Sequence, residues 1–249
     1  VEGSLLGVLD DTQTPMGGRL LRARLAQPLV DRAAIETRLD EVEALFADGV
    51  TRARVRAALK DMPDLERLSN RVLGGLSTPR DLVGIRRALE ATDELREALA
   101  GSEGALAELV AGLDPCPDVV DLIAGAIVDD PPAALSAGGV IRRGFSDELD
   151  GLLRSVREAR EWLASLERRE QERSGIKSLK VGYNKVFGYY IEVTKANLDA
   201  VPADYIRKQT LVNGERFITP ELKEVETLIL NAEERQAEVE ARLFREVCG

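Results

Sequence analysis

The sequence predicts a mainly α-helical protein, with a multi-helix core and a long antiparallel helical lever that carries a small antiparallel β-sheet at its tip. The composition supports the helical part, because the chain is rich in Leu, Ala, Glu and Arg and only 4% of it is aromatic. Two stretches of about 27 residues each carry an apolar stripe at helical spacing. Between them lies a segment crowded with Val, Tyr, Phe, Ile and Thr, the residues that favour strands.

The first part of the chain reads as a succession of helices separated by turn signals. Thr14-Pro15 and Thr78-Pro79 each place an N-cap residue before a Pro at the first helical position. The segment 31–48 has apolar residues at helical spacing, and Gly49 is expected to end that helix. The apolar residues of this segment are Ile35, Leu39, Val42 and either Leu45 or Phe46.

The segments 146–173 and 220–249 predict two helices of equal length, roughly 40 Å each at 1.5 Å per residue. Their apolar positions follow the narrow seam that is typical of paired helices. In the first segment the seam is Leu149, Leu152, Val156, Ala159, Leu163 and Leu166. In the second it is Leu222, Val225, Ile229, Ala232, Val239, Leu243 and Val247, with Gln236 as a polar interruption. Because matched helices that flank one insert can pack antiparallel, we expect the core and outgoing lever helix in 1–173, a β-rich insert in 174–220 and the returning lever helix in 221–249.

The insert itself predicts about four short strands. Apolar and polar residues alternate on both sides of a turn at 184–188, the period of a half-buried strand. The segments 205–212 and 215–219 flank Asn213-Gly214, the strongest short signal for a hairpin with a type I′ turn. Thr219-Pro220 then predicts the start of the returning helix.

No catalytic or metal-binding constellation is visible in the sequence. The chain contains no histidine, which removes the commonest general base and the commonest metal ligand. There is no Cys-x-x-Cys pair or Ser-centred elbow, and "GGVIRRG" at 138–144 lacks the Lys-Ser/Thr that a phosphate loop requires. Carboxylates on helices this rich in Glu are typical of solvated faces. The sequence therefore disfavours an independent enzyme and predicts no ATP hydrolysis by this chain.

The expected location is a reducing cytoplasm. No run of about 18 apolar residues occurs, so no membrane span is expected. The N-terminus "VEGSLLGVLDDT" lacks the basic region of a signal peptide. Cys116 and Cys248 lie far apart in sequence, which argues against a disulfide scaffold. The missing initiator Met and the abrupt end at "FREVCG" lead us to expect an excised fragment.

A basic island interrupts this acidic chain. The net charge is −10, which counts against nucleic-acid binding. Residues 176–219, however, hold seven basic and four acidic side chains, so this segment is +3 and the remainder is −13. Lys and Arg side chains that displace counterions from phosphates give salt-sensitive affinity without reading the bases. The alternative is that these are ordinary surface charges that keep an edge-rich sheet soluble, since +3 is modest for a nucleic-acid-binding segment.

The candidates for contact with phosphates are Lys185, Lys195, Arg207, Lys208 and Arg216. Lys185 lies in the first predicted turn, where its flexible stem can reach outward. Successive residues of a regular strand face opposite sides, so Arg207 and Lys208 cannot both face one phosphate track. We expect only one of these two to contact phosphates strongly. The aromatic residues of the first hairpin are expected to form the small core of the sheet rather than to stack on bases.

Several long motifs resemble, in one order along the chain, the MutS family of DNA mismatch repair proteins. "SLKVGYNKVFGYYIEVTKANLDAVPADYIRKQTLVNGERFITPELKE" at 178–224 is similar to the clamp of that family. "SLLGVLDDTQTPMGGRLLRARLAQPLVD" at 4–31 resembles its core segment, and "DLERLSNRV", "STPRDL" and "DDPPAALSAGGVIRRGFSDELDGL" resemble later parts. The resemblance covers nearly the whole chain. One departure is Phe187, which stands where many relatives have His.

The resemblance implies a protein that works as a dimer closing around duplex DNA, each subunit reaching down with a helical lever whose β clamp grips the backbone. It also implies that this chain is core, lever and clamp only. The family's mismatch-reading domain with its Phe-x-Glu wedge, its connector and its C-terminal ATPase have no match in these 249 residues. ATP and Mg then belong to the full-length family, and no cofactor is expected for the fragment.

The implied partners are the double-stranded DNA backbone, a second copy of the full-length protein in a homodimer, and mismatch repair partner proteins, with no membrane. The fragment alone is compatible with a monomer. The implied location is a bacterial-type cytoplasm, in association with the nucleoid.

Two other readings of the function stay open. A scaffold or coiled-coil spacer whose tip binds protein would use the same lever. A paralogue that lacks mismatch repair would fit the core region, but such relatives lack a clamp like 178–224. Salt-dependent binding to duplex DNA separates a gripping segment from a scaffold.

Overall fold

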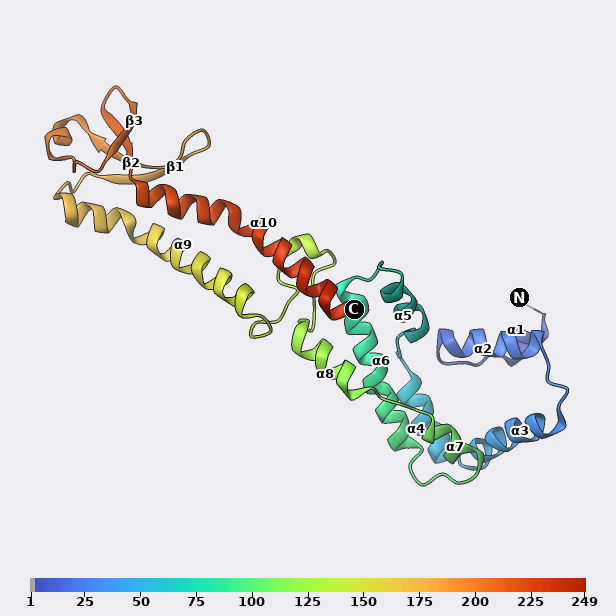
Figure 1. The fold of residues 1–249 in the computed structure, drawn as a ribbon. Coiled ribbons are helices and arrows are strands. Elements are labelled where there is room, and N and C mark those ends of the chain that lie inside the picture. Colours follow the sequence, from blue (N-terminus) through green and yellow to red (C-terminus); the bar gives the residue numbers. More distant parts are fainter. Residues whose placement is uncertain (1–2) are drawn as a thin grey trace. The chain divides into compact units, whose positions relative to one another are not determined.

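Helices make up most of the structure and one small antiparallel sheet interrupts them, which confirms the predicted fold class (Figure 1). The computed structural model describes residues 3–249. The chain divides into two compact units, the first reaching to Arg142 and including 243–249, the second comprising 143–242. Within the described residues, no helix has both the length and the apolar character needed to cross a membrane.

The first unit is built around α6 (Pro79–Ala98), which packs against α4 (Gly49–Leu59), α5 (Leu65–Leu73) and α8 (Pro117–Ala126). The predicted cap of α6 is confirmed, because Thr78 forms a capping box with Asp81. The buried side chains of α6 include Leu82, Val83, Ile85, Ala88 and Leu89. The other elements of this unit are α1 (Leu5–Leu9), α2 (Pro15–Ala26), α3 (Arg32–Ala47), α7 (Ala105–Ala111) and the 3₁₀ turn η1 (Leu135–Ala137).

Helix α3 forms where its periodicity predicts a helix, but much of its apolar stripe lies at the surface. Phe46 keeps 80% of its surface exposed, and Leu39 and Val42 are exposed as well. Gly49 does not act as a stop, because it is the first residue of α4. Instead, Asp48 ends α3 and caps α4, its carboxylate accepting hydrogen bonds from the N–H groups of the next helix. The prediction of a glycine stop was wrong because an N-cap residue at 48 lets the second helix start at once.

The second unit contains one long helix and most of another, which run antiparallel and side by side, with the sheet inserted between them in sequence (Figure 1). Helix α9 (Asp147–Ser174) has 28 residues and α10 (Pro220–Cys248) has 29, which confirms the predicted match in length. Gly175, in the left-handed conformation, ends α9. Thr219 begins α10 by accepting a hydrogen bond from the N–H of Leu222 at 3.1 Å. Seam residues that are buried in this unit are Leu149, Ala159, Leu166, Leu222 and Ala232.

Four short strands form one antiparallel sheet in the order β1-β2-β4-β3. They are β1 (Lys180–Asn184), β2 (Gly188–Thr194), β3 (Ile206–Thr210) and β4 (Gly214–Ile218), with the 3₁₀ helix η2 (Lys195–Ala200) after β2. One face of the sheet packs with the adjoining ends of α9 and α10. This sheet cluster consists of Leu166, Ile176, Leu179, Ile191, Val193, Tyr205, Phe217 and Leu222. Because a one-residue slip would turn this face outward, the cluster fixes the register of the strands.

The second hairpin does not have the predicted type I′ turn at Asn213-Gly214. Neither residue has the positive φ that such a turn requires. Gly214 is the first residue of β4, and the turn lies one residue earlier, with the Leu211 N–H donating to the Gly214 carbonyl at 2.8 Å. Gly214 pairs with Thr194, and a Cβ on it would overlap the carbonyl oxygen of Val193. The glycine therefore serves the close approach of two strands rather than the turn.

The first hairpin has its turn where the sequence predicts it. Asn184 pairs with Gly188, and the three residues between them form the loop. The side-chain oxygen of Asn184 accepts a hydrogen bond from the N–H of Val186 at 2.7 Å. Gly188 has a φ of +80°, and a Cβ on it would overlap the carboxylate of Glu226. Both the left-handed backbone and the lack of space require glycine at 188.

We therefore expect Gly188→Ala to destabilise the second unit by at least about 1 kcal/mol, because alanine is strained at positive φ and would displace Glu226. Thermal unfolding followed by circular dichroism measures the effect. Gly151→Ala is the matched control. It lies within α9 with open space around its Cβ, so it should stabilise the protein by about 0.5–1 kcal/mol. Equal stability of the Gly188→Ala variant and the parent would contradict the assigned backbone.

Candidate nucleic-acid interface

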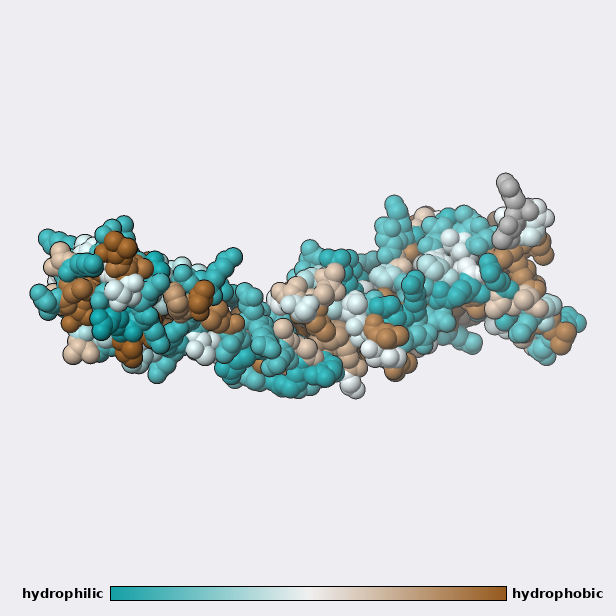
Figure 2. Space-filling view, turned by 90° about the horizontal axis from the view of Figure 1, so that it is seen from above, coloured by the Kyte–Doolittle hydropathy of each residue, from teal (hydrophilic) through white to brown (hydrophobic). Residues whose placement is uncertain are grey.

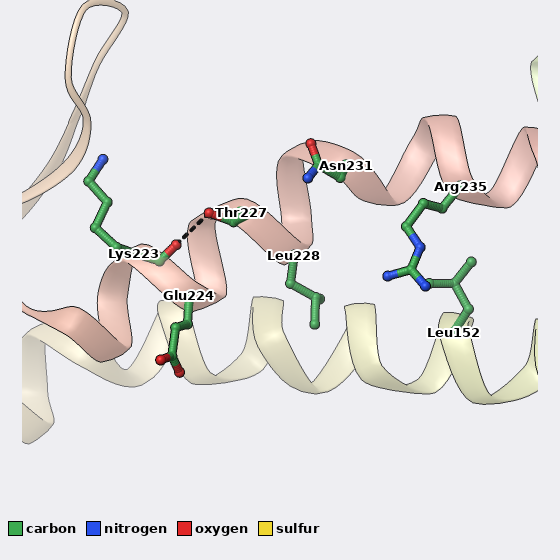
Figure 3. Close-up of a pocket in the computed structure, with 7 residues that line it drawn as sticks. All are labelled: Leu152, Lys223, Glu224, Thr227, Leu228, Asn231 and Arg235. Carbon is green, nitrogen blue, oxygen red and sulfur yellow. Dashed lines mark hydrogen bonds between the residues drawn. The ribbon is translucent and has the colours of Figure 1, made fainter.

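A groove of about 460 Å³ lies between α9 and α10 (Figure 3). Leu228 and Glu224 point from α10 toward α9, whereas Lys223 points away from α9 (Figure 3). The hydroxyl of Thr227 donates to the backbone carbonyl of Lys223 at 2.8 Å, which engages the only hydroxyl among the residues drawn. The described part of the chain also holds no group of His, Cys, Asp and Glu that could bind a metal ion. The groove lies where the two helices run side by side. The candidate site is a second pocket, which lies at the sheet.

Lys185 and Lys208, 23 positions apart in sequence, line one pocket of about 460 Å³ between the first hairpin turn and the start of α10. Both side chains are exposed, and neither has an ion-pair partner among the described residues. The other lining residues are Tyr183, Val186, Phe187, Gly188, Lys223, Glu226, Thr227 and Leu230. We call this site the lysine pocket.

A β-bulge lies at Lys208. In the pairing of β3 with β4, Arg207 lies opposite Phe217 and Gln209 lies opposite Arg216, so Lys208 is the additional residue. Regular alternation therefore does not govern Arg207 and Lys208, and the premise of the sequence argument was wrong at this point. Which of the two contacts DNA stays a prediction.

The two arginines among the candidates are engaged within the sheet. Arg216 is in register with Glu192, pairs with it at 2.9 Å, and donates to the side chain of Gln209 at 3.0 Å. Its guanidinium carbon also lies 4.1 Å from the ring centroid of Tyr190, and only 19% of its side chain is exposed. Arg207 pairs with Glu215 at 3.1 Å but keeps 64% of its side chain exposed.

Lys195 lies apart from the lysine pocket. It is the exposed first residue of η2, and its backbone N–H donates to the carbonyl of Asn213 at 3.1 Å. This places its backbone next to the second hairpin turn. The five candidates thus fall into a pair that shares a pocket, two arginines with acidic partners, and one separate lysine.

Among the α10 residues that line the lysine pocket are two charged side chains, Lys223 and Glu226, and the sequence argument missed both. Glu226 is only 5% exposed, and its Oε1 accepts a hydrogen bond from the N–H of Tyr189 at 3.2 Å. Its Oε2 pairs with the ammonium group of Lys223, which also donates to the carbonyl of Phe187 at 2.9 Å. In sequence this is a Lys-x-x-Glu pair, which on a helix is typical of an exposed surface pair. No local signal shows that the hairpin turn covers it.

A buried polar network ties the sheet to the end of α9. The hydroxyl of Tyr205 donates to Glu170 at 2.7 Å, and Glu170 is only 8% exposed. Arg173 pairs with Glu170 at 2.8 Å and with Asp204 at 3.0 Å. The pKa of Tyr205 is raised well above its ordinary value. Burial is the larger cause and the hydrogen bond to Glu170 is the second. The network holds Asp204 and Tyr205, the residues just before β3, to the end of α9.

Comparison with known proteins gives one consistent result. The family described as MutS domain III matches residues 1–249. The DNA mismatch repair protein MutS of Salinibacter ruber is 51% identical over 247 residues, covering 99% of this chain. The proteins of the same name from Pelotomaculum thermopropionicum and Brevibacillus brevis are 50% and 51% identical and each cover 98% of it. The chain spans only 27–28% of the length of these three relatives.

The variant Tyr205→Phe should lower the free energy of unfolding at pH 7 by about 1–3 kcal/mol, because Glu170 loses a buried donor. The raised pKa of Tyr205 means that the unfolded chain releases this proton first as the pH rises. The parent should therefore lose stability above about pH 10, the ordinary pKa of tyrosine, and the variant should lose less. Urea unfolding from pH 7 to pH 11 tests whether the two stability curves converge. Parallel curves would show that the network does not perturb Tyr205.

Proposed function

The chain belongs to the MutS family, and on this premise we propose that its β-sheet is a clamp that grips duplex DNA through the phosphate backbone, without reading the bases. The observation that carries the proposal is the lysine pocket. Lys185 and Lys208 line it together, both are exposed, and neither has an ion-pair partner in the described residues. Two uncompensated ammonium groups at one place suit a phosphate and its neighbour along a strand.

The surroundings of the pocket suit a sugar–phosphate backbone. Val186, at the tip of the first hairpin, is 82% exposed, and Tyr183 is 53% exposed. Figure 2 shows apolar surface interleaved with polar surface around the sheet. Deoxyribose presents apolar C–H groups between charged phosphates, so exposed apolar side chains beside lysines complement it. The contact we propose uses Lys185 and Lys208 first, Lys195 next, and Arg207 and Arg216 only in so far as DNA competes with their carboxylate partners.

Further features of the proposed function follow from the family rather than from these residues. We propose the division into core and outgoing lever helix (1–173), clamp (174–220) and returning lever helix (221–249). We also propose that the protein acts in mismatch repair as a homodimer with other repair proteins, in the cytoplasm of a bacterium. Support comes from similarity to relatives named as DNA mismatch repair proteins.

The 249-residue chain should bind matched and mismatched duplexes with equal affinity, because backbone contacts carry no sequence information. Fluorescence anisotropy with two labelled duplexes that differ at one base pair is the measurement. Low salt, about 50 mM, is needed for detectable binding by so few phosphate contacts. A preference for the mismatched duplex at any salt concentration would contradict a backbone-only grip.

Replacing Lys185 and Lys208 together by Ala should weaken binding and lower the slope of log affinity against log salt by up to about 1.8, since each lost phosphate contact contributes about 0.9. Lys177→Ala with Lys180→Ala is the matched control, because both are exposed lysines of the same segment that do not line the pocket. Circular dichroism checks that all variants stay folded.

If the Lys185/Lys208 variant keeps both its affinity and its salt slope, the clamp proposal fails and a scaffold whose tip binds protein becomes the better reading. If the Lys177→Ala/Lys180→Ala control lowers the salt slope as much, binding depends on the overall positive charge of the segment and not on the lysine pocket in particular.

A further inference from the structure

The turn that presents Lys185 is held from outside the sheet. Lys223 donates to the carbonyl of Phe187 at 2.9 Å, and Glu226 accepts from the N–H of Tyr189 at 3.2 Å. These two backbone groups flank Gly188, where the hairpin turn returns to β2. Lys223 and Glu226 pair with each other one turn apart on α10, so together they form a clasp around the glycine.

The clasp leaves the turn little freedom. The carboxylate of Glu226 occupies the space that a Cβ on residue 188 would need, so the helix and the turn are in close contact there. The carboxylate is almost fully buried, and both of its oxygens have partners. A buried carboxylate that lost these partners would be costly, which favours the clasped arrangement over an open turn.

The charges show that Lys223 has a different part from Lys185. Its ammonium group is already neutralised by Glu226 and is engaged with a carbonyl oxygen. Two of its three N–H donors are therefore already used, whereas Lys185 and Lys208 have no ion-pair partner among the described residues.

We propose that Lys223 and Glu226 are positioning residues for phosphate binding, and that through them α10 holds the Lys185 turn in the geometry that a backbone phosphate requires. This inference rests on the proposed function, because it concerns the same pocket. It adds that the returning helix, and not the sheet alone, determines how well Lys185 engages DNA.

A double-mutant cycle on the 249-residue chain separates positioning from direct contact. Lys185→Ala is introduced into the parent and into Lys223→Met, which keeps the aliphatic stem and removes both bonds of the ammonium group. If the clasp positions the turn, Lys185→Ala should weaken duplex binding in the parent but change it by less than about twofold in the Lys223→Met background. Lys177→Met, the same charge change outside the pocket, should leave the full effect of Lys185→Ala in place.

Hydrogen exchange supplies a readout that does not depend on DNA. Lys223→Met should speed exchange of the amides of residues 186–189 while leaving those of β4 unchanged, which also shows that the sheet stays folded. Equal effects of Lys185→Ala in the two backgrounds would overturn the proposal and make Lys223 an independent contact. Unchanged exchange in the turn would overturn it as well. If Lys185→Ala has no effect even in the parent, the proposed function fails instead, so the two failures are distinguishable.

Discussion

The apolar cluster beneath the sheet is the interaction on which the second unit depends. Four strands of five to seven residues bury little surface by themselves and need a partner to be stable. Here Ile191, Val193 and Phe217 pack with Leu166 and Leu222 from the adjoining helix ends. Because this face can be buried in only one register, the cluster also fixes where both hairpin turns lie. A lysine on a turn has a defined position only because the strands beneath it cannot slide.

The arginines and lysines of the basic segment divide by chemistry. Within the segment, Arg207 and Arg216 each pair with a carboxylate of 176–219, as does Arg173 just before it, whereas the exposed lysines there have no ion pair among the described residues. Arginine presents a planar fork that suits carboxylates and aromatic faces, while lysine is a point charge on a flexible stem. The acidic residues therefore neutralise mainly arginines that serve the fold. The cationic side chains that remain unpaired are therefore a better guide to binding than the net charge of +3 for the segment.

Local signals predicted the elements well and their partners poorly. The helix caps at Thr78 and Thr219 and the lengths of α9 and α10 follow from short-range chemistry, which the sequence displays directly. The bulge at Lys208 and the close approach of β2 to Gly214 depend on residues of neighbouring strands. No pattern within β3 or β4 therefore reveals them. Glu226 is the clearest case. On α10 it looks like any surface glutamate, and only contact with a turn 37 residues earlier buries it.

The affinity of a protein for phosphates gains more from holding its lysines on a rigid turn than from adding further charges. Each phosphate contact adds a modest, salt-dependent amount to the binding free energy. If the turn is flexible, the entropy lost when DNA orders it reduces that gain. The sheet cluster, the Tyr205 network and the clasp on Gly188 all remove that freedom in the folded chain, before DNA arrives. Under the proposed function, two lysines would still provide only a weak contact at physiological salt. Useful affinity then requires a second clamp on the same duplex. Once the first clamp is bound, the second is held at a high effective concentration near the DNA, so the two weak contacts together bind tightly. A homodimer that closes around DNA would satisfy that requirement without any stronger site in either subunit.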